Sequence, residues 1–213
     1  MNCKLAKALT YNLVLICVFL IAFSAHAFYP VSYNKGNVIL MYHNFVPDQV
    51  FKTCNKYRHN KDTMPVSQFD REMAFLAGHG YRTMLMKEAA QYLRAGVNLP
   101  GKTVLITFDD GYESNYLYAY PILQKYNIKA NIAVIVEKSL KARGHDLLNY
   151  DPASNYHLSF NEMKEMQKSG LVEIGSHSYD GHYMVLSDRL GHMGKFYTTQ
   201  IYDPLTQVKE SYE

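Results

Sequence analysis

The sequence lacks a disulfide framework. It contains Cys3, Cys17 and Cys54, and the first two lie in an N-terminal segment that we expect to be removed. Cys54 would then have no partner in the mature chain. Such a domain depends on a hydrophobic core, and 213 residues that are 48% hydrophobic suffice for one ordinary domain. Small disulfide-rich extracellular scaffolds are therefore excluded.

The sequence also lacks a strong charge of either sign. The formal net charge is +3, and loss of Lys4 and Lys7 with the N-terminal segment leaves about +1. A charge this close to zero gives no indication of a nucleic-acid partner. The sequence shows no internal repeat and no low-complexity tract, which argues against a repeat protein and against a linker between two domains.

The longest apolar run is too short to be a clear membrane span. Residues 13–23 are apolar, lysines precede them, and small residues end the segment at Ala27. This pattern is typical of a secretory signal peptide over residues 1–27. The alternative is an uncleaved membrane anchor, although a spanning helix needs about 20 apolar residues. We expect residues 28–213 to be secreted, or exported to the periplasm or cell envelope.

Short apolar segments alternate with amphipathic segments along the remaining chain. Ser67 and Ser159 are each followed by an acid three residues later, which predicts helix starts of the capping-box type. The predicted strands are 37–44, 81–86, 104–108, 130–136 and 171–175, the predicted helices are 67–78, 87–95, 114–126 and 159–170, and the predicted loops are 47–64 and 138–155. This alternation predicts an α/β fold with a parallel sheet, either open or closed as a barrel.

Polar side chains follow two of these strands. The apolar run 104–108 is typical of a strand buried on both faces, and it leads directly into Asp109 and Asp110. The strand at 171–175 leads into His177 and His182. In an open sheet and in a barrel alike, active sites lie at the carboxyl ends of the strands. The sequence therefore predicts one site that contains both groups.

Two imidazoles and one carboxylate can hold a divalent metal and leave its other positions open to water and substrate. A bound metal lowers the pKa of water to about 7 and polarises a carbonyl oxygen, while a second carboxylate accepts the proton. Asp-Asp-Gly alone is more often a turn, and a lone histidine is more often structural. The conjunction of both groups at strand ends favours a metal site.

These segments resemble the motifs of polysaccharide deacetylases of the NodB-homology type. Residues 107–111, Thr-Phe-Asp-Asp-Gly, are similar to the first motif, and His177-Ser with His182 is similar to the second. The resemblance implies a distorted (β/α) barrel, a divalent metal that is often zinc, and hydrolysis of N-acetyl groups from a polysaccharide. It also implies that Asp109 is the general base and that Asp110, His177 and His182 are the metal ligands.

The spacing of the two histidines points to one branch of the family. They stand five residues apart, whereas four is commoner in the family. Residues 177–182 and 111–116 are similar to deacetylases that act on biofilm poly-β-1,6-N-acetylglucosamine, which implies a polysaccharide rich in N-acetylglucosamine as substrate. Residues 41–44 are similar to the same branch, and His43 could line the cleft. A histidine that satisfies backbone groups at a strand end explains His43 equally well, so we assign it no role.

The family pattern continues past the end of this sequence. A third motif with an arginine, a fourth with an acid and an aromatic residue, and a late Leu-x-His have no match before Glu213. We expect residues 28–213 to form about the N-terminal two-thirds of the barrel. Three explanations are possible: a truncated gene or incomplete sequence, completion of the barrel by another polypeptide, or a short form without catalysis. The alternative to an enzyme is a fragment that binds metal or glycan without turnover.

Overall fold

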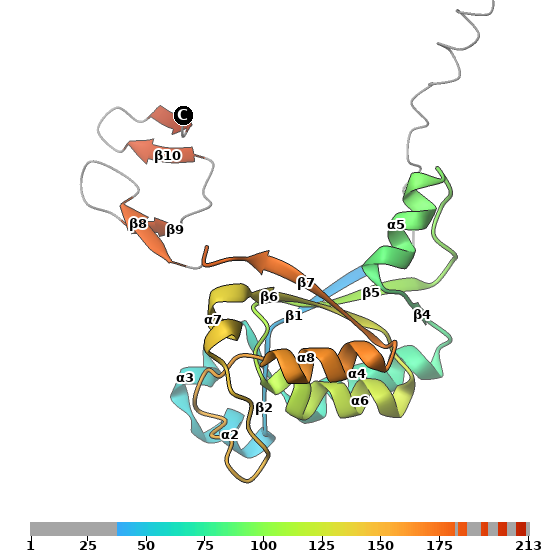
Figure 1. The fold of residues 1–213 in the computed structure, drawn as a ribbon, viewed down its shortest axis with the longest axis horizontal. Helices are drawn as coiled ribbons and strands as arrows, with labels where there is room; N and C mark the ends of the chain where they lie inside the picture. Colours follow the sequence, from blue (N-terminus) through green and yellow to red (C-terminus); the bar gives the residue numbers. More distant parts are fainter. Residues whose placement is uncertain (1–37, 182, 187–192, 196–199, 204–207, 212–213) are drawn as a thin grey trace, which may run out of the picture.

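The computed structural model describes residues 38–181, 183–186, 193–195, 200–203 and 208–211 (Figure 1). Its elements are β1 (Val38–Tyr42), β2 (Asn44–Val46), α2 (Asp48–Thr53), α3 (Asn55–Arg58), β3 (Thr63–Pro65), α4 (Val66–Gly78), β4 (Arg82–Thr83), α5 (Met86–Arg94), β5 (Thr103–Phe108), the π-helix η1 (Asn115–Ala119), α6 (Tyr120–Tyr126), β6 (Ala130–Ile135), α7 (Val136–Lys141), α8 (Phe160–Lys168), β7 (Val172–Ser178), β8 (Met184–Leu186), β9 (Met193–Lys195), β10 (Gln200–Asp203) and β11 (Val208–Ser211). Among these described residues, no helix is both long enough and apolar enough to cross a membrane.

A parallel sheet forms the centre of the fold. The strand order is β1-β5-β6-β7, and β4 also pairs with β5. Leu40 lies opposite Ile106, Phe108 lies opposite Ile132, and Ile132 lies opposite Ile174. Because all these pairs are parallel, the carboxyl ends of β1, β5, β6 and β7 lie at one edge of the sheet. The α/β fold with a parallel sheet predicted from the sequence is confirmed.

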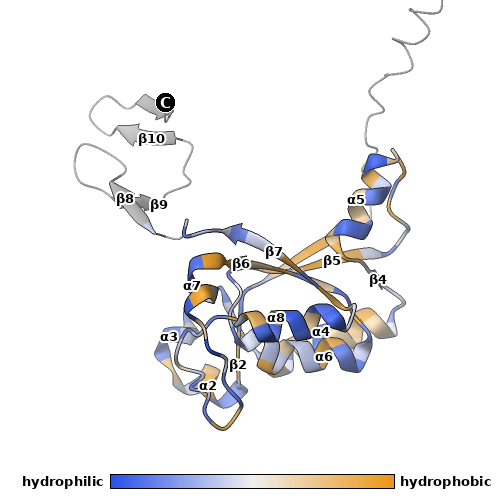
Figure 2. Ribbon diagram, in the orientation of Figure 1, coloured by the Kyte–Doolittle hydropathy of each residue, from blue (hydrophilic) through white to orange (hydrophobic). Residues whose placement is uncertain are grey.

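The main core lies between one face of this sheet and helices α4, α6 and α8, which run side by side beneath it in Figure 1. Val104, Ile106 and Phe108 occupy alternate positions of β5 and are buried in this core. Phe108 and Phe69 of α4 meet with their ring centroids 5.7 Å apart. Figure 2 shows β5 in orange, as expected for a strand covered on both faces.

The opposite face of the sheet is covered only in part among the described residues. Leu105 points away from the main core and packs with Met84 and with Ala89 of α5. Ile39 and Met41 of β1 lie on the same face as Leu105, because Ile39 pairs with Leu105 in the register. Ile39 is 58% exposed and Met41 is 62% exposed. The apolar surface of β1 is thus left to the solvent on this face.

Two of the predicted segments differ from the structure near the N-terminal helices. The stretch 47–64, predicted as a loop, contains α2, α3 and the start of β3. Ser67 does not cap α4, which begins one residue earlier, after Pro65. The Ser67 backbone N–H and hydroxyl instead donate to the carboxylate of Asp48 in α2. The contact of Ser67 with Asp48, which lies 19 positions earlier in the chain, therefore replaces the predicted helix cap.

The later helices follow the sequence more closely. The capping box at Ser159 is confirmed: the backbone N–H of Glu162 donates to the Ser159 hydroxyl, and the Ser159 backbone N–H donates to the Glu162 carboxylate at 2.8 Å. Pro121 lies in the first turn of α6 and separates it from η1, because proline lacks the N–H that a helix interior needs. The predicted loop 138–155 begins later than expected, since α7 extends to Lys141.

Candidate metal centre and active site

The chain turns sharply where β5 ends. The Asp109 backbone N–H donates to the carbonyl of Tyr42 in the adjacent strand at 2.8 Å, which continues the β1–β5 pairing. Asp110 and Gly111 then both have φ of +69°, in the left-handed region. The Ile135 backbone N–H donates to the Asp110 carbonyl at 3.3 Å. The turn therefore leans across the end of β6, toward β7.

Gly111 is required by the space available as well as by its backbone angle. A Cβ atom at this position would lie 2.6 Å from Val134 Cγ1 and 3.1 Å from the Val134 Cα atom of β6. A side chain would push the turn off the sheet. The glycine of the Thr-Phe-Asp-Asp-Gly sequence thus lets Asp110 reach across β6.

His177 approaches Asp110 from the other side of β6. The pairing of β6 with β7 shifts between Val134 and Ile135, so that Ser176 and Ser178 are paired and His177 lies at the irregularity. Such a bulge changes the direction of a side chain. The Ser178 hydroxyl accepts a hydrogen bond from the Gly181 backbone N–H at 2.9 Å, which holds the chain after the strand.

The distance between these side chains suits two ligands of one cation. His177 Nε2 lies 3.7 Å from Asp110 Oδ1, and the side chains are 29% and 11% exposed, respectively. Two ligand atoms that each lie about 2.0–2.1 Å from a tetrahedral zinc are about 3.4 Å apart. The third predicted ligand, His182, lies outside the described residues. Within the described part of the chain, no group of three or more potential metal ligands comes together.

Asp109 and His43 lie next to each other at the ends of neighbouring strands. Tyr42 and Phe108, which precede them, are partners in the β1–β5 register. Both side chains are half-buried. The His43 carbonyl accepts from the side-chain amide of Asn115 at 2.7 Å, so the backbone of His43 is fixed independently of its ring. A cavity of about 250 Å³ is lined by residues that include His43.

Polar residues after Gly111, which had no individual role in the prediction from the sequence, position these strand ends. The Ser114 hydroxyl donates to the side-chain carbonyl of Asn44 at 2.7 Å and accepts from the Phe45 backbone N–H at 3.0 Å. Ser114 and Asn115 are fully buried. In the sequence they stood out only as part of residues 111–116, through the resemblance to deacetylases of poly-β-1,6-N-acetylglucosamine.

Tyr112 and His157 form the wall beside Asp110. Their rings stack with centroids 5.1 Å apart. Burial, and after it the negative charge of Asp110, raises the pKa of the Tyr112 hydroxyl to about 12. Burial, and after it the charge of Lys138, lowers the pKa of His157 to about 4. Near neutral pH, this wall therefore presents a protonated phenol and a neutral imidazole.

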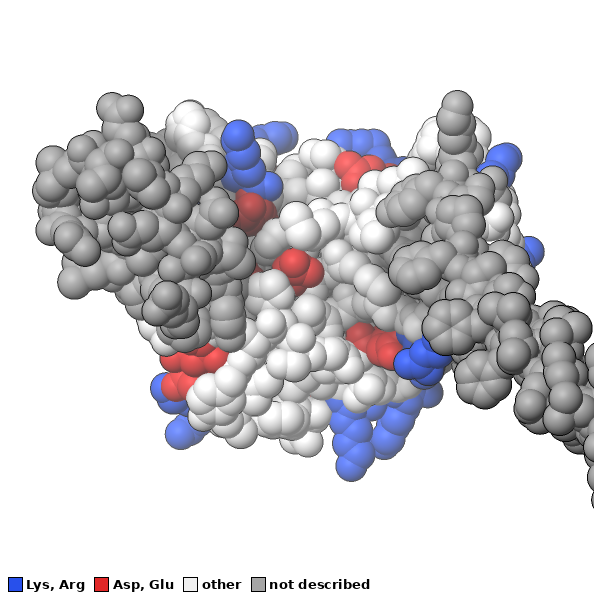
Figure 3. Space-filling model, turned by 90° about the horizontal axis from the view of Figure 1, so that it is seen from above, with Lys and Arg blue, Asp and Glu red and all other residues white. Residues whose placement is uncertain are grey.

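The described charges on one face of the molecule do not single out a macromolecular partner. On the face shown in Figure 3, acidic and basic side chains are interspersed rather than gathered into one patch. A larger cavity of about 670 Å³ lies between β1 and α4 and reaches Val38 and Val104, at the amino ends of their strands. Because active sites of parallel sheets lie at the carboxyl ends, the Asp110 edge remains the candidate site.

An acidic pair and an imidazole at the carboxyl edge of a parallel sheet define the class of metal-assisted hydrolases as the candidate class. Residues 96–212 match the family model described as polysaccharide deacetylase. This match covers more than half of the 213 residues, and the chain therefore belongs to the polysaccharide deacetylase family.

Individual relatives agree with this family. The chain is 38% identical over 142 residues to YxkH of Bacillus subtilis (strain 168), a protein assigned to the polysaccharide deacetylases, and the match covers 67% of this chain and 42% of that protein. It is 29% identical over 176 residues to the poly-β-1,6-N-acetyl-D-glucosamine N-deacetylase of Escherichia coli (strain K12), covering 79% of this chain and 24% of that protein.

A solved structure shares the fold. The structure of a de-N-acetylase from Aggregatibacter actinomycetemcomitans superposes with a TM-score of 0.61 at 25% identity, over 75% of this chain and 61% of that chain. Relative to YxkH and to the Escherichia coli N-deacetylase, the chain spans less than half the length of each protein.

Proposed function

We propose that this protein is a metal-dependent hydrolase that removes N-acetyl groups from a polysaccharide containing N-acetylglucosamine. The observation that carries the proposal is the approach of His177 Nε2, in β7, to Asp110 Oδ1 at 3.7 Å. Asp110 directly follows Asp109 after the end of β5. The relatives named for poly-β-1,6-N-acetyl-D-glucosamine support this polysaccharide as the substrate.

Asp110, His177 and His182 would hold the cation, and zinc suits a set of two imidazoles and one carboxylate. The cation would supply a Lewis acid that polarises the acetamide carbonyl and makes water more acidic. Asp109 accepts the proton of the attacking water, acting as general base. Tyr112 and His157 stack against each other, and the charge of Asp110 acts on both side chains.

The leaving nitrogen of the sugar must receive a proton when the C–N bond breaks. His43 follows β1, on the side of β5 that is opposite to β7 and His177. We therefore propose His43 as the proton donor. Replacing His43 by Gln is expected to slow acetate release by about 100-fold or more, while bound metal stays the same. Wild-type turnover by this variant, measured on the same oligomer, would remove His43 from the mechanism.

The proposal is tested by measuring metal content and acetate release together. The purified full chain should contain about one divalent ion and should release acetate from a β-1,6-linked N-acetylglucosamine oligomer, with loss of activity in chelator and recovery with Zn²⁺. Acetate release that does not depend on metal would contradict the mechanism. Metal binding without acetate release would favour the second candidate, a fragment that binds metal or glycan without turnover.

We also propose that the protein works outside the cytoplasm. The support is the signal-like sequence of residues 1–27, which lies outside the described residues. An extracellular polysaccharide would be reachable only after export. Recovery of the chain in the cytoplasm with residues 1–27 intact would argue against this location.

A further inference from the structure

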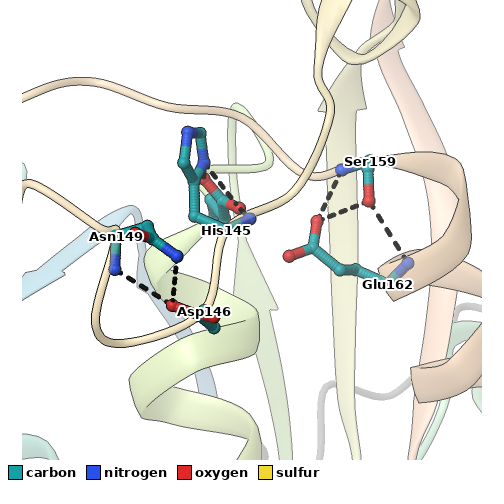
Figure 4. A network of polar contacts seen from close by, with 6 residues as sticks. His145, Asp146, Asn149, Ser159 and Glu162 are labelled. Carbon is teal, nitrogen blue, oxygen red and sulfur yellow. Dashed lines mark hydrogen bonds and ion pairs between the residues drawn. The ribbon is translucent and has the colours of Figure 1, made fainter.

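Glu113, His145 and Glu162 form a second cluster of titratable side chains, of which Figure 4 labels His145 and Glu162. Glu113 precedes η1, His145 belongs to the segment 142–159 that joins α7 to α8, and Glu162 lies in the first turn of α8. Glu113 is 0% exposed and Glu162 is 7% exposed. Carboxyl groups are seldom buried to this extent without partners, so the cluster calls for a physical account.

His145 contacts the Glu113 carboxylate through both its backbone and its ring. The His145 backbone N–H donates to Glu113 Oε1. His145 Nδ1 lies 2.8 Å from Glu113 Oε2, and the His145 side chain is 28% exposed. These contacts supply donors to both oxygens of a carboxylate that has no access to water.

Glu162 is satisfied at only one of its oxygens. Its Oε2 atom accepts from the Ser159 backbone N–H at 2.8 Å and from the Ser159 hydroxyl at 2.7 Å. Its Oε1 atom is buried, and no donor among the described residues reaches it. Gly144 passes so close that a Cβ atom there would lie 3.4 Å from this Oε1 atom. An unpaired carboxylate oxygen in this place is costly unless it carries a proton.

The electrostatics of the pair agree with a proton on Glu162. Burial, opposed by the Ser159 hydrogen bonds and reinforced by Glu113, raises the pKa of Glu162 to about 7. A protonated Glu162 can donate to Glu113, so that the two carboxyl groups share one proton and one negative charge. The other titratable groups that act on the pair are Tyr116 of η1 and Tyr150 of the connecting segment.

This cluster is connected to the candidate site through the backbone. The Leu158 backbone N–H donates to the Gly111 carbonyl at 2.9 Å, and the Glu113 backbone N–H donates to the Tyr156 carbonyl at 3.0 Å. Tyr112 and His157 form the bridge between these two hydrogen bonds. The segment 156–158 therefore pairs with the residues that directly follow Asp110, and Glu113 ties the same residues to His145.

We propose that Glu113, His145 and Glu162 form a positioning unit that holds the Asp109–Gly111 turn against β6. None of the three contacts the reacting atoms, so they are positioning residues. Their effect on catalysis rests on the proposed function, whereas their effect on the turn does not. The unit weakens as the pH rises through about 7, because ionised Glu162 no longer donates to Glu113.

Two amide variants of the full chain distinguish the members of the pair. In Glu162→Gln, the new amide N–H₂ replaces the shared proton at every pH, so the turn should stay in place. In Glu113→Gln, the carboxylate that accepts from His145 and from Glu162 is lost. Asp146→Asn is the matched control, because Asp146 bonds only within its own loop, to Leu148 and Asn149, and the variant keeps an acceptor oxygen.

Hydrogen exchange of the Glu113 and Leu158 amides measures the turn without reference to activity. At pH 6, exchange should accelerate about 10-fold to 100-fold in Glu113→Gln and remain near wild type in Glu162→Gln and Asp146→Asn. At pH 8, after correction for intrinsic exchange, Glu162→Gln should protect these amides better than the wild type does. The absorption spectrum of bound Co²⁺ should change in Glu113→Gln alone.

Unchanged protection and an unchanged Co²⁺ spectrum in Glu113→Gln would overturn the proposal. If Glu113→Gln loses protection throughout β6 as well, the His145→Gln variant replaces it in the test, because the His145 side chain is partly exposed. Faster exchange only at the amides of residues 113 and 158 in His145→Gln would then support the positioning unit. Unchanged exchange at these two amides would overturn the proposal. If the exchange results appear as expected while the wild type releases no acetate, the positioning unit stands and the proposed function fails.

Discussion

Replacing Asp109 by Asn is expected to reduce acetate release by about 1,000-fold or more without loss of bound metal. An amide of the same shape cannot accept the proton of the attacking water, and a positioned general base contributes about 100-fold to 10,000-fold to such reactions. Asp109 follows β5 directly and its backbone is held by Tyr42, so the substitution should leave the fold unchanged. Initial rates on an N-acetylglucosamine oligomer and metal content of the same preparation are the measurements.

Asp110→Asn is the matched control for this result. It should lose metal as well as activity, because the carboxylate ligand is weakened while the neighbouring base remains. The pair of variants separates the two roles, which the sequence alone assigns only by resemblance. Loss of metal in Asp109→Asn, with retention in Asp110→Asn, would mean that the two acids have exchanged roles.

Replacing Gly111 by Ala is expected to destabilise the protein by about 2–5 kcal/mol. The left-handed backbone costs an alanine about 1–2 kcal/mol, and forcing an extra methyl group into a packed site costs about 1–3 kcal/mol. The added Cβ would meet Val134 Cγ1 at 2.6 Å. In a protein of this size, each kcal/mol lowers Tm by about 2–4 °C, so thermal unfolding provides the measurement.

Gly80→Ala separates the two costs. Gly80 has φ of +68° and no atom within 4 Å of an added Cβ, so this variant carries the backbone cost without the contact with Val134. Adding Val134→Ala to Gly111→Ala should recover part of the loss, although the Val134 Cα atom at 3.1 Å remains. Equal losses of stability in Gly111→Ala and Gly80→Ala would show that Val134 of β6 moves away from the added methyl group at little cost.

The parts of the fold that the sequence predicted well are those set by local pattern. The apolar run 104–108 became β5, and Ser159 with Glu162 began α8 as a capping box. The short helices α2 and α3 were missed because a few residues are too short to show helical periodicity. Ser67 misled the prediction because its partner, Asp48, lies 19 residues away in the chain, where no local rule applies.

The sequence predicted which residues lie together at the carboxyl edge of the sheet. It could not predict the geometry that those residues adopt. Sequence placed Asp110 and His177 after different strands, but the left-handed turn at Asp110 and the pairing shift at His177 bring their atoms to 3.7 Å. Both features depend on contacts with β6. Glu113 was one acid among several in the sequence, and only its complete burial reveals it as a structural partner of the turn.

The leaning of the Asp110 turn across β6 has a thermodynamic consequence. Asp110 and His177 come from β5 and β7, which are not adjacent, so an ion held by both would span a strand that it does not touch. Separating the strands would then require release of the ion. At a free ion concentration 100 times Kd, this linkage adds about 2.7 kcal/mol to the free energy of opening the sheet. Tighter binding of the cation would thus raise the free energy needed to open the sheet by a corresponding amount.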